Sequence, residues 1–437
     1  MAKPEESPRA PRAQSVDDVI VAFGQPHGAD ARPALTSSSL LAAVCRAGTK
    51  HIYGDTADVE ELRATISSGA GIFREVDGNT ANQPLVRKVI ARYLEGDGPA
   101  TWARQLRALR PDLPAERLTP LLYAIVCGRI GNDAARAFGA GRAWEVSLQL
   151  HMRLGEDAEA ATRVGRYLRR MVPSGVVKVP FTPQAPHCIL VARDLEREGI
   201  PVNFTSTFSA RQVVVAALLA DVTLTNIFMG RLNQGLKAAL LGEHVDLAAQ
   251  RALLRLRREG KTKTLLIVAS VREWQTFVHV AGCDVFTAPC ESIRGLLTQT
   301  EFAAADIKSQ LDTSYEDRLG IAPEVLQALP QERVARLYAV EPELVQFLTE
   351  LRATKEYAAL RDGEQLFKRF DEAGFGDVFY APTAGERQEL RKNKLPDLGA
   401  PLTQRLPVDT LYTLLADADF RKFQEEMDAM IEQRIGA

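Results

Sequence analysis

The sequence predicts an α/β fold, a (β/α)8 TIM barrel with inserted helices and a helical C-terminal extension. Eight short apolar runs that are typical of buried strands recur between residues 51 and 289. Helical patterns fill most of the gaps between these runs. The glycine fingerprint GxGxxG of an open dinucleotide-binding sheet is absent. Strands and helices that alternate in this way over about 250 residues are typical of a closed barrel.

The predicted elements follow one another in a regular order. Strands are expected at residues 51–56, 71–76, 144–150, 176–181, 201–208, 221–229, 263–270 and 283–289. Helices are expected at residues 37–47, 59–66, 157–171, 186–198, 209–219, 245–258, 272–281 and 291–297. The gap between the second and third strands is too long for a simple connection. Its patterns LVRKVIARYLEG and LTPLLYAIVCGRI predict inserted helices over residues 87–143.

The chain divides into three predicted segments. Residues 1–36 are expected to be a disordered arm, because their opening stretch MAKPEESPRAPRAQS lacks even the apolar core of a signal peptide. Residues 37–300 form the predicted barrel, and residues 301–437 a mostly helical extension that ends in FRKFQEEMDAMIEQRI. The extension could be an independent domain, an active-site cover or an oligomer contact, so homo-oligomerisation stays open. The simplest interpretation is a solvated helical decoration of the barrel.

Composition excludes several classes of function. The 437 residues include 54 Lys and Arg against 56 Asp and Glu, so no overall charge favours nucleic acid or an anionic membrane. No apolar run is long enough to span a bilayer. The five cysteines are far apart and form no CxxC pairs, which argues against a disulfide framework or a zinc site. The six histidines show no HExxH or HxH spacing, so a metal site is not expected. We therefore expect a cytoplasmic protein that needs no metal and no cofactor.

One lysine lies inside a stretch that otherwise resembles a buried strand. Lys178 belongs to GVVKVPFT, and an unpaired ammonium there costs several kcal/mol. Burial lowers the pKa of a lysine, and a partly neutral amine at a strand end is what Schiff-base chemistry on a carbonyl substrate needs. The alternative is a lysine whose stem lies in the barrel wall while its amine reaches water or an ion pair.

Other polar residues lie at the ends of the predicted strands. In a barrel the C-terminal ends of the strands meet at one face, so these residues are expected to surround Lys178. Such a set would be costly in a core and is useful in a pocket. Its members are Asp55, Asn79, Asn82, Gln149, Asn203, Thr205, Asn226, Arg231, Ser270 and Arg272.

Three of these residues suit a phosphate group. The guanidinium groups of Arg231 and Arg272 pair with phosphate oxygens, and the Ser270 hydroxyl adds a donor. Ser270 and Arg272 also open a predicted helix, whose backbone N–H groups would point at an anion. The alternative is that both arginines close ion pairs around the barrel rim. Their position near Lys178 favours a sugar phosphate.

Asp55 is the acid/base candidate. A carboxylate opposite the lysine can take a proton from a substrate hydroxyl and return it to a carbanionic intermediate. In DTADVEEL, Asp55 could equally cap the following helix, although Asp58 stands closer to that helix and would cap it better.

Seven blocks of the sequence together resemble the transaldolase family. They occur in order between about residue 50 and residue 300, which is far more specific than any single block. The blocks are DTAD at 55–58, TAN at 80–82, VSLQL at 146–150, VKVPFT at 177–182, GIPVNFTSTFSARQ at 199–212, NIFMGR at 226–231 and ASVR at 269–272.

The resemblance implies a (β/α)8 barrel whose fourth-strand lysine forms a Schiff base with a ketose phosphate and transfers a dihydroxyacetone unit to an aldose phosphate. The donor would be sedoheptulose 7-phosphate or fructose 6-phosphate of the pentose phosphate pathway. Lys178 would be the nucleophile, Asp55 the acid/base, and Thr205 would orient the catalytic water. The substrate-binding residues implied are Asn82 and Asn203 for the hydroxyls, and Arg231, Ser270 and Arg272 for the phosphate.

The sequence also departs from the family. Gln149 stands where transaldolases usually have a glutamate and resembles the related fructose 6-phosphate aldolases, whereas Phe228 matches transaldolases. Glutamine can hold a water but cannot take its proton. Asn226 replaces a usual serine, and Asn82 is followed by Gln-Pro instead of standing in the usual NPS. Three functions stay open: a transaldolase, a transaldolase-like aldolase, and a barrel that only binds sugar phosphates.

Overall fold

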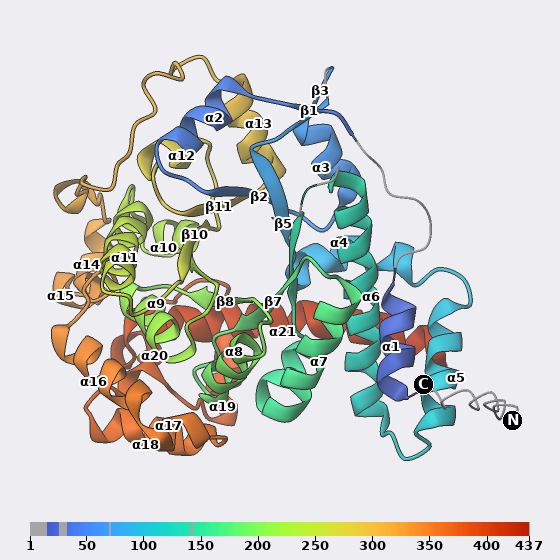
Figure 1. The fold of residues 1–437 in the computed structure, drawn as a ribbon. Helices are drawn as coiled ribbons and strands as arrows, with labels where there is room; N and C mark the ends of the chain where they lie inside the picture. The colour runs from blue at the N-terminus through green and yellow to red at the C-terminus, as the bar shows by residue number, and fades with distance from the viewer. Residues whose placement is uncertain (1–14, 26–32, 70, 140–141, 143, 437) are drawn as a thin grey trace, which may run out of the picture.

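The computed structural model describes residues 15–25, 33–69, 71–139, 142 and 144–436, and it confirms the predicted (β/α)8 barrel (Figure 1). Eight parallel strands close into a ring in the order β10-β11-β2-β5-β6-β7-β8-β9. In chain order the strands are β2 (His51–Asp55), β5 (Val76–Thr80), β6 (Glu145–Gln149), β7 (Gly175–Pro180), β8 (Val202–Thr207), β9 (Leu224–Phe228), β10 (Leu265–Ala269) and β11 (Val285–Ala288).

The second barrel strand differs from the prediction. Residues 71–76 were expected to form it, but Gly71–Phe73 is β4 of a small separate sheet with β1 (Leu35–Thr36) and β3 (Ser67–Ser68). The barrel strand β5 has the sequence VDGNT. Its polar residues interrupt the apolar run by which the other strands were predicted. Gly78 is required there because a Cβ would lie 2.6 Å from both the Glu145 backbone oxygen and the Tyr53 ring.

Helices connect the barrel strands as expected, with one exception. They are α2 (Ser39–Arg46), α3 (Val59–Ile66), α7 (Ala158–Met171), α8 (His187–Arg197), α9 (Ala210–Val215) with a π-helical turn (Ala216–Ala220), α10 (Met229–Gly235), α11 (Leu241–Arg258), α12 (Thr276–His279) and α13 (Cys290–Thr298). The exception is the helix predicted over 272–281, because only the short α12 forms there. Ser270 has a left-handed backbone (φ 63°), which turns the chain away from a helix at that point.

The inserted helices are confirmed. They are α4 (Gln83–Tyr93), α5 (Gly98–Leu109) and α6 (Ala115–Phe138). The prediction of a disordered arm over 1–36 is wrong for α1 (Val16–Gly24), whose N-cap is Ser15 and whose apolar side is buried against α5, α6 and α7. The stretch VDDVIVAFG has the apolar spacing of a helix. The prediction missed this helix because the residues before the stretch are rich in proline and arginine, which is typical of a disordered segment. Residues 1–14 and 26–32 lie outside the described residues.

The C-terminal extension is helical, as predicted. Its helices are α14 (Pro323–Ala328), α15 (Gln331–Ala335), α16 (Pro342–Ala353), α17 (Lys355–Ala359), α18 (Gly363–Glu372), α19 (Ala384–Leu390), α20 (Pro401–Arg405) and α21 (Val408–Ile435). The extension also contains short 3₁₀ turns at Glu316–Arg318 and Gly376–Val378, and a further 3₁₀ turn, Met152–Glu156, follows β6 of the barrel. The last helix, α21, runs behind the barrel in red in Figure 1 and contacts α4, α5, α6 and β8. Among the described helices, none has both the length and the apolar character to cross a membrane.

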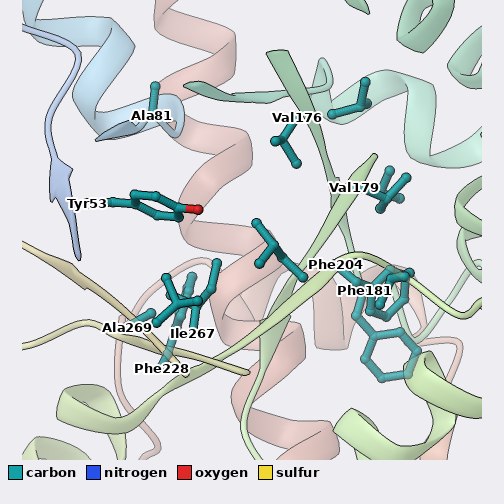
Figure 2. Close-up of a cluster of buried hydrophobic side chains, with 14 of the residues drawn as sticks. Tyr53, Ala81, Val176, Val179, Phe181, Phe204, Phe228, Ile267 and Ala269 are labelled. Atoms are coloured by element: carbon teal, nitrogen blue, oxygen red, sulfur yellow. The ribbon is translucent and has the colours of Figure 1, made fainter. Parts of the chain in front are cut away.

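The barrel wall alternates between apolar and polar side chains. Val179 and Phe204 belong to the buried apolar cluster in Figure 2, and they alternate along β7 and β8 with Lys178 and Asn203. Successive side chains of a strand point to opposite faces. The apolar residues therefore pack against the surrounding helices, and the polar residues face the barrel axis.

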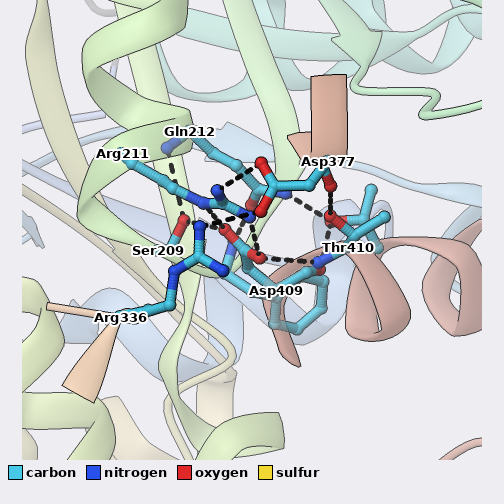
Figure 3. Close-up of polar contacts among 9 residues, drawn as sticks. Ser209, Arg211, Gln212, Arg336, Asp377, Asp409 and Thr410 are labelled. Carbon is cyan, nitrogen blue, oxygen red and sulfur yellow. Dashed lines mark hydrogen bonds and ion pairs between the residues drawn. The ribbon is translucent and has the colours of Figure 1, made fainter. Parts of the chain in front are cut away.

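A buried ion-pair cluster holds the start of α21 against the barrel (Figure 3). The Arg211 guanidinium of α9 donates to both Asp409 carboxylate oxygens at 2.7 and 2.8 Å and to Asp377 at 2.9 Å. Ser209 adds a hydrogen bond to Asp409 at 2.6 Å. Burial alone would raise the pKa of Asp409, but the contact with Arg211 lowers it.

We predict that Arg211→Ala lowers the free energy of unfolding by about 3–5 kcal/mol, because it leaves the Asp409 carboxylate buried without a counter-ion. Arg336→Ala is the matched control, since Arg336 is 44% exposed and pairs with Asp377 at 2.8 Å. It should cost less than about 1 kcal/mol. Urea unfolding followed by circular dichroism measures both variants. Equal losses would contradict the importance of the Arg211–Asp409 pair, and replacing both partners by Met and Leu should cost less than Arg211→Ala.

Candidate active site

Lys178 lies on β7 inside the barrel and is 3% exposed. The strand register pairs it with Gln149 of β6 and with Asn203 of β8. Within the described residues its amine makes no ion pair, although the charge of Asp55 acts on it. Burial lowers the pKa of Lys178 to about 8, and the negative charge of Asp55 opposes this shift. A buried amine with this pKa is partly neutral near neutral pH.

Asp55 ends β2 and is free of a capping role. Its Oδ1 accepts a hydrogen bond from Thr80 Oγ1 at 2.7 Å. The cap of α3 is Asp58, whose Oδ1 accepts from the backbone N–H groups of Glu60 and Glu61, as the sequence predicted. Burial raises the pKa of Asp55, although Lys178, Thr80 and Arg272 each lower it. A carboxyl group with a raised pKa beside an amine can exchange protons.

Amides and hydroxyls form a buried polar layer next to the lysine. Asn203 Nδ2 donates to Ser147 Oγ at 3.2 Å, and Asn226 Nδ2 donates to Asn203 Oδ1 at 3.1 Å. Three further oxygen atoms in this layer are buried with no partner among the described residues: Gln149 Oε1, Thr205 Oγ1 and Asn226 Oδ1. Unpaired polar atoms in an interior are costly, so their concentration here indicates a place for water or a polar ligand.

Three predicted site residues have additional structural roles. Asn82 is the N-cap of α4, and its Oδ1 accepts from the Leu85 N–H at 3.1 Å. Gln149 Nε2 contacts the Met152 sulfur at 3.6 Å. Phe228 is only 6% exposed and belongs to the cluster of Figure 2. These contacts fix the side chains of Asn82, Gln149 and Phe228.

The three phosphate candidates are close to one another but differ in their surroundings. Arg231 is 5% exposed, and its Nη2 donates to Asp419 of α21 at 2.7 Å. Its guanidinium lies over the rings of Phe228 and Phe420 at 5.8 and 5.5 Å. Arg272 is exposed and makes no ion pair within the described part of the chain. Arg272 and Ser270 lie beside the chain at Arg231, because a Cβ added to Gly230 would be 2.9 Å from Arg272 Cγ and closer still to the Ser270 backbone oxygen.

One feature of the expected phosphate site is wrong. Ser270 and Arg272 do not open a helix, because α12 begins only at Thr276 and has four residues. The backbone N–H groups of a helix N-terminus are therefore not aimed at this place.

Helix α21 lies across the C-terminal ends of the strands. Residues that follow β5, β6, β7 and β9 each contact it through a polar pair. These pairs are Gln83–Gln424 at 3.4 Å, His151–Asp428 at 2.8 Å, Gln184–Asp417 at 2.9 Å and Arg231–Asp419 at 2.7 Å. These contacts lie at the end of the barrel that carries the predicted site residues.

Comparison with known proteins decides the family. A family model described as Transaldolase/Fructose-6-phosphate aldolase matches residues 52–336. The chain belongs to this family. A probable transaldolase of Aquifex aeolicus is 35% identical over 237 residues, which cover 54% of this chain and 83% of that protein. A probable transaldolase of Rhodospirillum centenum is 29% identical over 56% of this chain and 82% of its own length. A transaldolase of Acidobacterium capsulatum is 25% identical over 63% and 80%.

Several residues of this transaldolase-family site were not singled out from the sequence. Thr80 bonds both to Asp55 and to Thr287 Oγ1, the latter at 2.6 Å, and Ser147 supports Asn203. Ser147 alternates with Gln149 on β6, so the period of two could have identified it. Asp419 lies in the extension, beyond the matched region, and no sequence signal connects it to Arg231.

We predict that Lys178→Met raises the free energy of unfolding at pH 7 by about 1–3 kcal/mol, because it removes a buried amine without a partner. The folded-state pKa of about 8 lies below the ordinary 10.5, so the unfolded chain binds more protons between these values. The advantage of the variant should therefore shrink as the pH rises through that window.

Thermal unfolding at several pH values measures this difference. Lys368→Met is the control, since the Lys368 side chain is 75% exposed, and it should leave stability within about 0.5 kcal/mol. A Lys178→Met protein that is less stable than the wild type at pH 7 would contradict the cost assigned to the buried amine.

Proposed function

We propose that the protein is a transaldolase, which transfers a dihydroxyacetone unit from a ketose phosphate to an aldose phosphate through a Schiff base on Lys178. The observation that carries the proposal is the buried amine of Lys178, with a pKa of about 8, in register between Gln149 and Asn203 and near the Asp55 carboxyl. Fructose 6-phosphate and sedoheptulose 7-phosphate are the proposed donors, in the pentose phosphate pathway of the cytoplasm.

The first step joins Lys178 to the substrate. The neutral amine attacks the C2 carbonyl of the ketose, and loss of water from the resulting carbinolamine gives an iminium ion. Thr205 and Gln149 have buried oxygen atoms that are free to hold this water. The departing hydroxyl needs a proton to leave as water. Gln149 can orient this water but cannot transfer a proton, so the protonated Asp55 carboxyl is the proposed proton donor.

The second step breaks the bond between C3 and C4. Asp55 takes the proton of the C4 hydroxyl, the C4 aldehyde leaves, and the bonding electrons pass into the iminium to form an enamine. Asn203 would hold a hydroxyl of the bound three-carbon unit. Arg231, Ser270 and Arg272 would hold the phosphate of the donor and then of the acceptor. The enamine attacks the acceptor aldehyde, Asp55 returns the proton, and hydrolysis frees Lys178.

The extension supports this proposal by covering the barrel. We propose that residues 37–300 form the catalytic barrel and that residues 301–437 close its mouth, because α21 contacts the segments that follow four of the strands. A covered mouth excludes water, which would otherwise protonate the enamine.

A second candidate is a transaldolase-like aldolase that releases dihydroxyacetone. Gln149 favours it, because this residue replaces the usual glutamate of transaldolases. A barrel that only binds sugar phosphates is a third candidate, and the following experiment separates it from both enzymes.

We predict that sodium borohydride added with fructose 6-phosphate fixes a three-carbon unit on Lys178. Mass spectrometry of a tryptic digest locates the adduct. Its rate of formation should rise with pH around a midpoint of about 8, because only the neutral amine attacks. Asp55→Asn should move this midpoint to lower pH, because the carboxylate raises the pKa of Lys178.

Lys178→Met is the negative control, and it should give no adduct while remaining folded. Lys368→Met, with an exposed lysine, should give the wild-type adduct. A wild-type protein that binds fructose 6-phosphate but carries no adduct on Lys178 would support the binding-only barrel and overturn the enzymatic proposal.

The fate of the three-carbon unit separates a transaldolase from an aldolase. With fructose 6-phosphate alone, a transaldolase should form no more than one equivalent of free glyceraldehyde 3-phosphate per site, and erythrose 4-phosphate should start turnover. Continuous release of dihydroxyacetone without an acceptor would instead identify an aldolase. Gln149→Glu should increase the acceptor-dependent rate, because a carboxylate can take the proton of the bound water.

A further inference from the structure

Asp419 of the extension lies between two cations at the barrel mouth, Arg231 and Lys394. Its Oδ2 is 2.7 Å from Arg231 Nη2 and 3.9 Å from Lys394 Nζ, and its side chain is 12% exposed. Lys394 lies between α19 and α20 and is 52% exposed. Arg231 and Arg272 both lower the pKa of Lys394, as does its partial burial. Arg231 and Lys394 therefore flank one carboxylate. Arg272 lies beside the chain at Arg231, because a Cβ added to Gly230 would be 2.9 Å from Arg272 Cγ.

This arrangement has an excess of positive charge and unused donors. Arg231 Nη1 is buried and has no hydrogen-bond partner among the described residues. Arg272 forms no ion pair there, and Lys394 is at the outer limit of an ion pair with Asp419. A single carboxylate does not neutralise three cations, whereas a phosphate dianion carries enough charge and oxygen atoms to engage them together.

The contacts of the Arg231 guanidinium leave one of its nitrogen atoms, Nη1, without a partner among the described residues. The rings of Phe228 and Phe420 lie over the guanidinium, and Asp419 holds Nη2. A phosphate that pairs with an arginine through two parallel hydrogen bonds needs two nitrogen atoms on one side of the fork. Asp419 occupies one of these nitrogen atoms.

We propose that Asp419 and Lys394 of the extension are part of the phosphate site. Asp419 is an internal carboxylate that the substrate phosphate displaces from Arg231, and Lys394 is an additional cation that contacts the phosphate. This inference rests on the proposed function, in which Arg231 and Arg272 bind the phosphate. Both residues lie beyond the region matched by the family, so the extension would set the affinity of this chain for phosphorylated sugars.

The consequence is a selectivity for doubly charged substrates. A phosphate dianion competes with a carboxylate for Arg231 through its greater charge, whereas a sugar without phosphate cannot displace Asp419. Removing the carboxylate should strengthen phosphate binding, and removing the lysine should weaken it.

Isothermal titration with inorganic phosphate at low ionic strength tests the role of Asp419 in the full-length protein. Asp419→Asn should lower the dissociation constant about tenfold, because the competing charge is gone. Glu426→Gln is the matched control on the same helix, with a 54% exposed side chain, and it should bind phosphate as the wild type does. Asp419→Thr also removes the charge, and it replaces Asp419→Asn in the titration if the asparagine side chain destabilises the protein. An unchanged or larger dissociation constant would overturn the displacement of Asp419.

The same titration tests Lys394. Lys394→Met should raise the dissociation constant about threefold to fivefold, as expected for one partly exposed charge. Lys392→Met is the control two residues away, because Lys392 is 65% exposed and pairs with Glu389. It should have no effect. A Lys394→Met protein that binds phosphate like its control would remove Lys394 from the site.

A further variant separates this inference from the proposed function. Arg231→Gln should abolish phosphate binding. If Arg231→Gln binds phosphate normally, the phosphate site of the proposed function is wrong. If Arg231→Gln loses binding while Asp419→Asn equals the wild type, only the present inference is wrong. Borohydride trapping with dihydroxyacetone, which carries no phosphate, tests Lys178 independently of both.

Discussion

The burial of one amine is the constraint on which the site depends. Lys178 lies inside a closed ring of strands, where its ammonium form is disfavoured and its pKa falls to about 8. A lysine on the rim would remain charged and would be a poor nucleophile. The packed apolar side of the wall, with Val179 and Phe204, makes this burial tolerable because it holds β7 and β8 in place. Burial also raises the pKa of Asp55, so the same physical cause brings the pKa values of the carboxyl and the amine closer together.

The extension packs against the end of the barrel where the predicted site residues lie. Helix α21 is anchored at its start by the Arg211–Asp409 pair and contacts the ends of four strands along its length. The proposed cover of the mouth would reduce the access of water, which strengthens the interactions between charged groups. The ion pair of Arg231 with Asp419 is an example of such an interaction, because Arg231 is only 5% exposed. The charge balance of the mouth therefore depends on a segment outside the family's matched region.

The polar layer around Lys178 is held at a cost in stability. Gln149, Thr205 and Asn226 each keep a buried oxygen atom without a partner among the described residues. A protein selected only for stability would fill this layer with apolar side chains. The amides of Asn203 and Asn226 fix one another, so the layer is rigid although it is incompletely paired. Unpaired but well-held groups of this kind are suited to a polar substrate.

The sequence by itself determined the barrel and most of its site. Period-two alternation and strand-end positions are local properties, so they identified β7 with Lys178 and the set from Asp55 to Arg272. Where polar site residues replaced the apolar pattern, as in VDGNT of β5, the same local signal failed. Only the tertiary structure decided that Ser270 starts no helix, that Val16–Gly24 packs as α1, and that Asp419 meets Arg231. The last contact joins residues 188 positions apart, and no local pattern encodes which surface an amphipathic helix will cover.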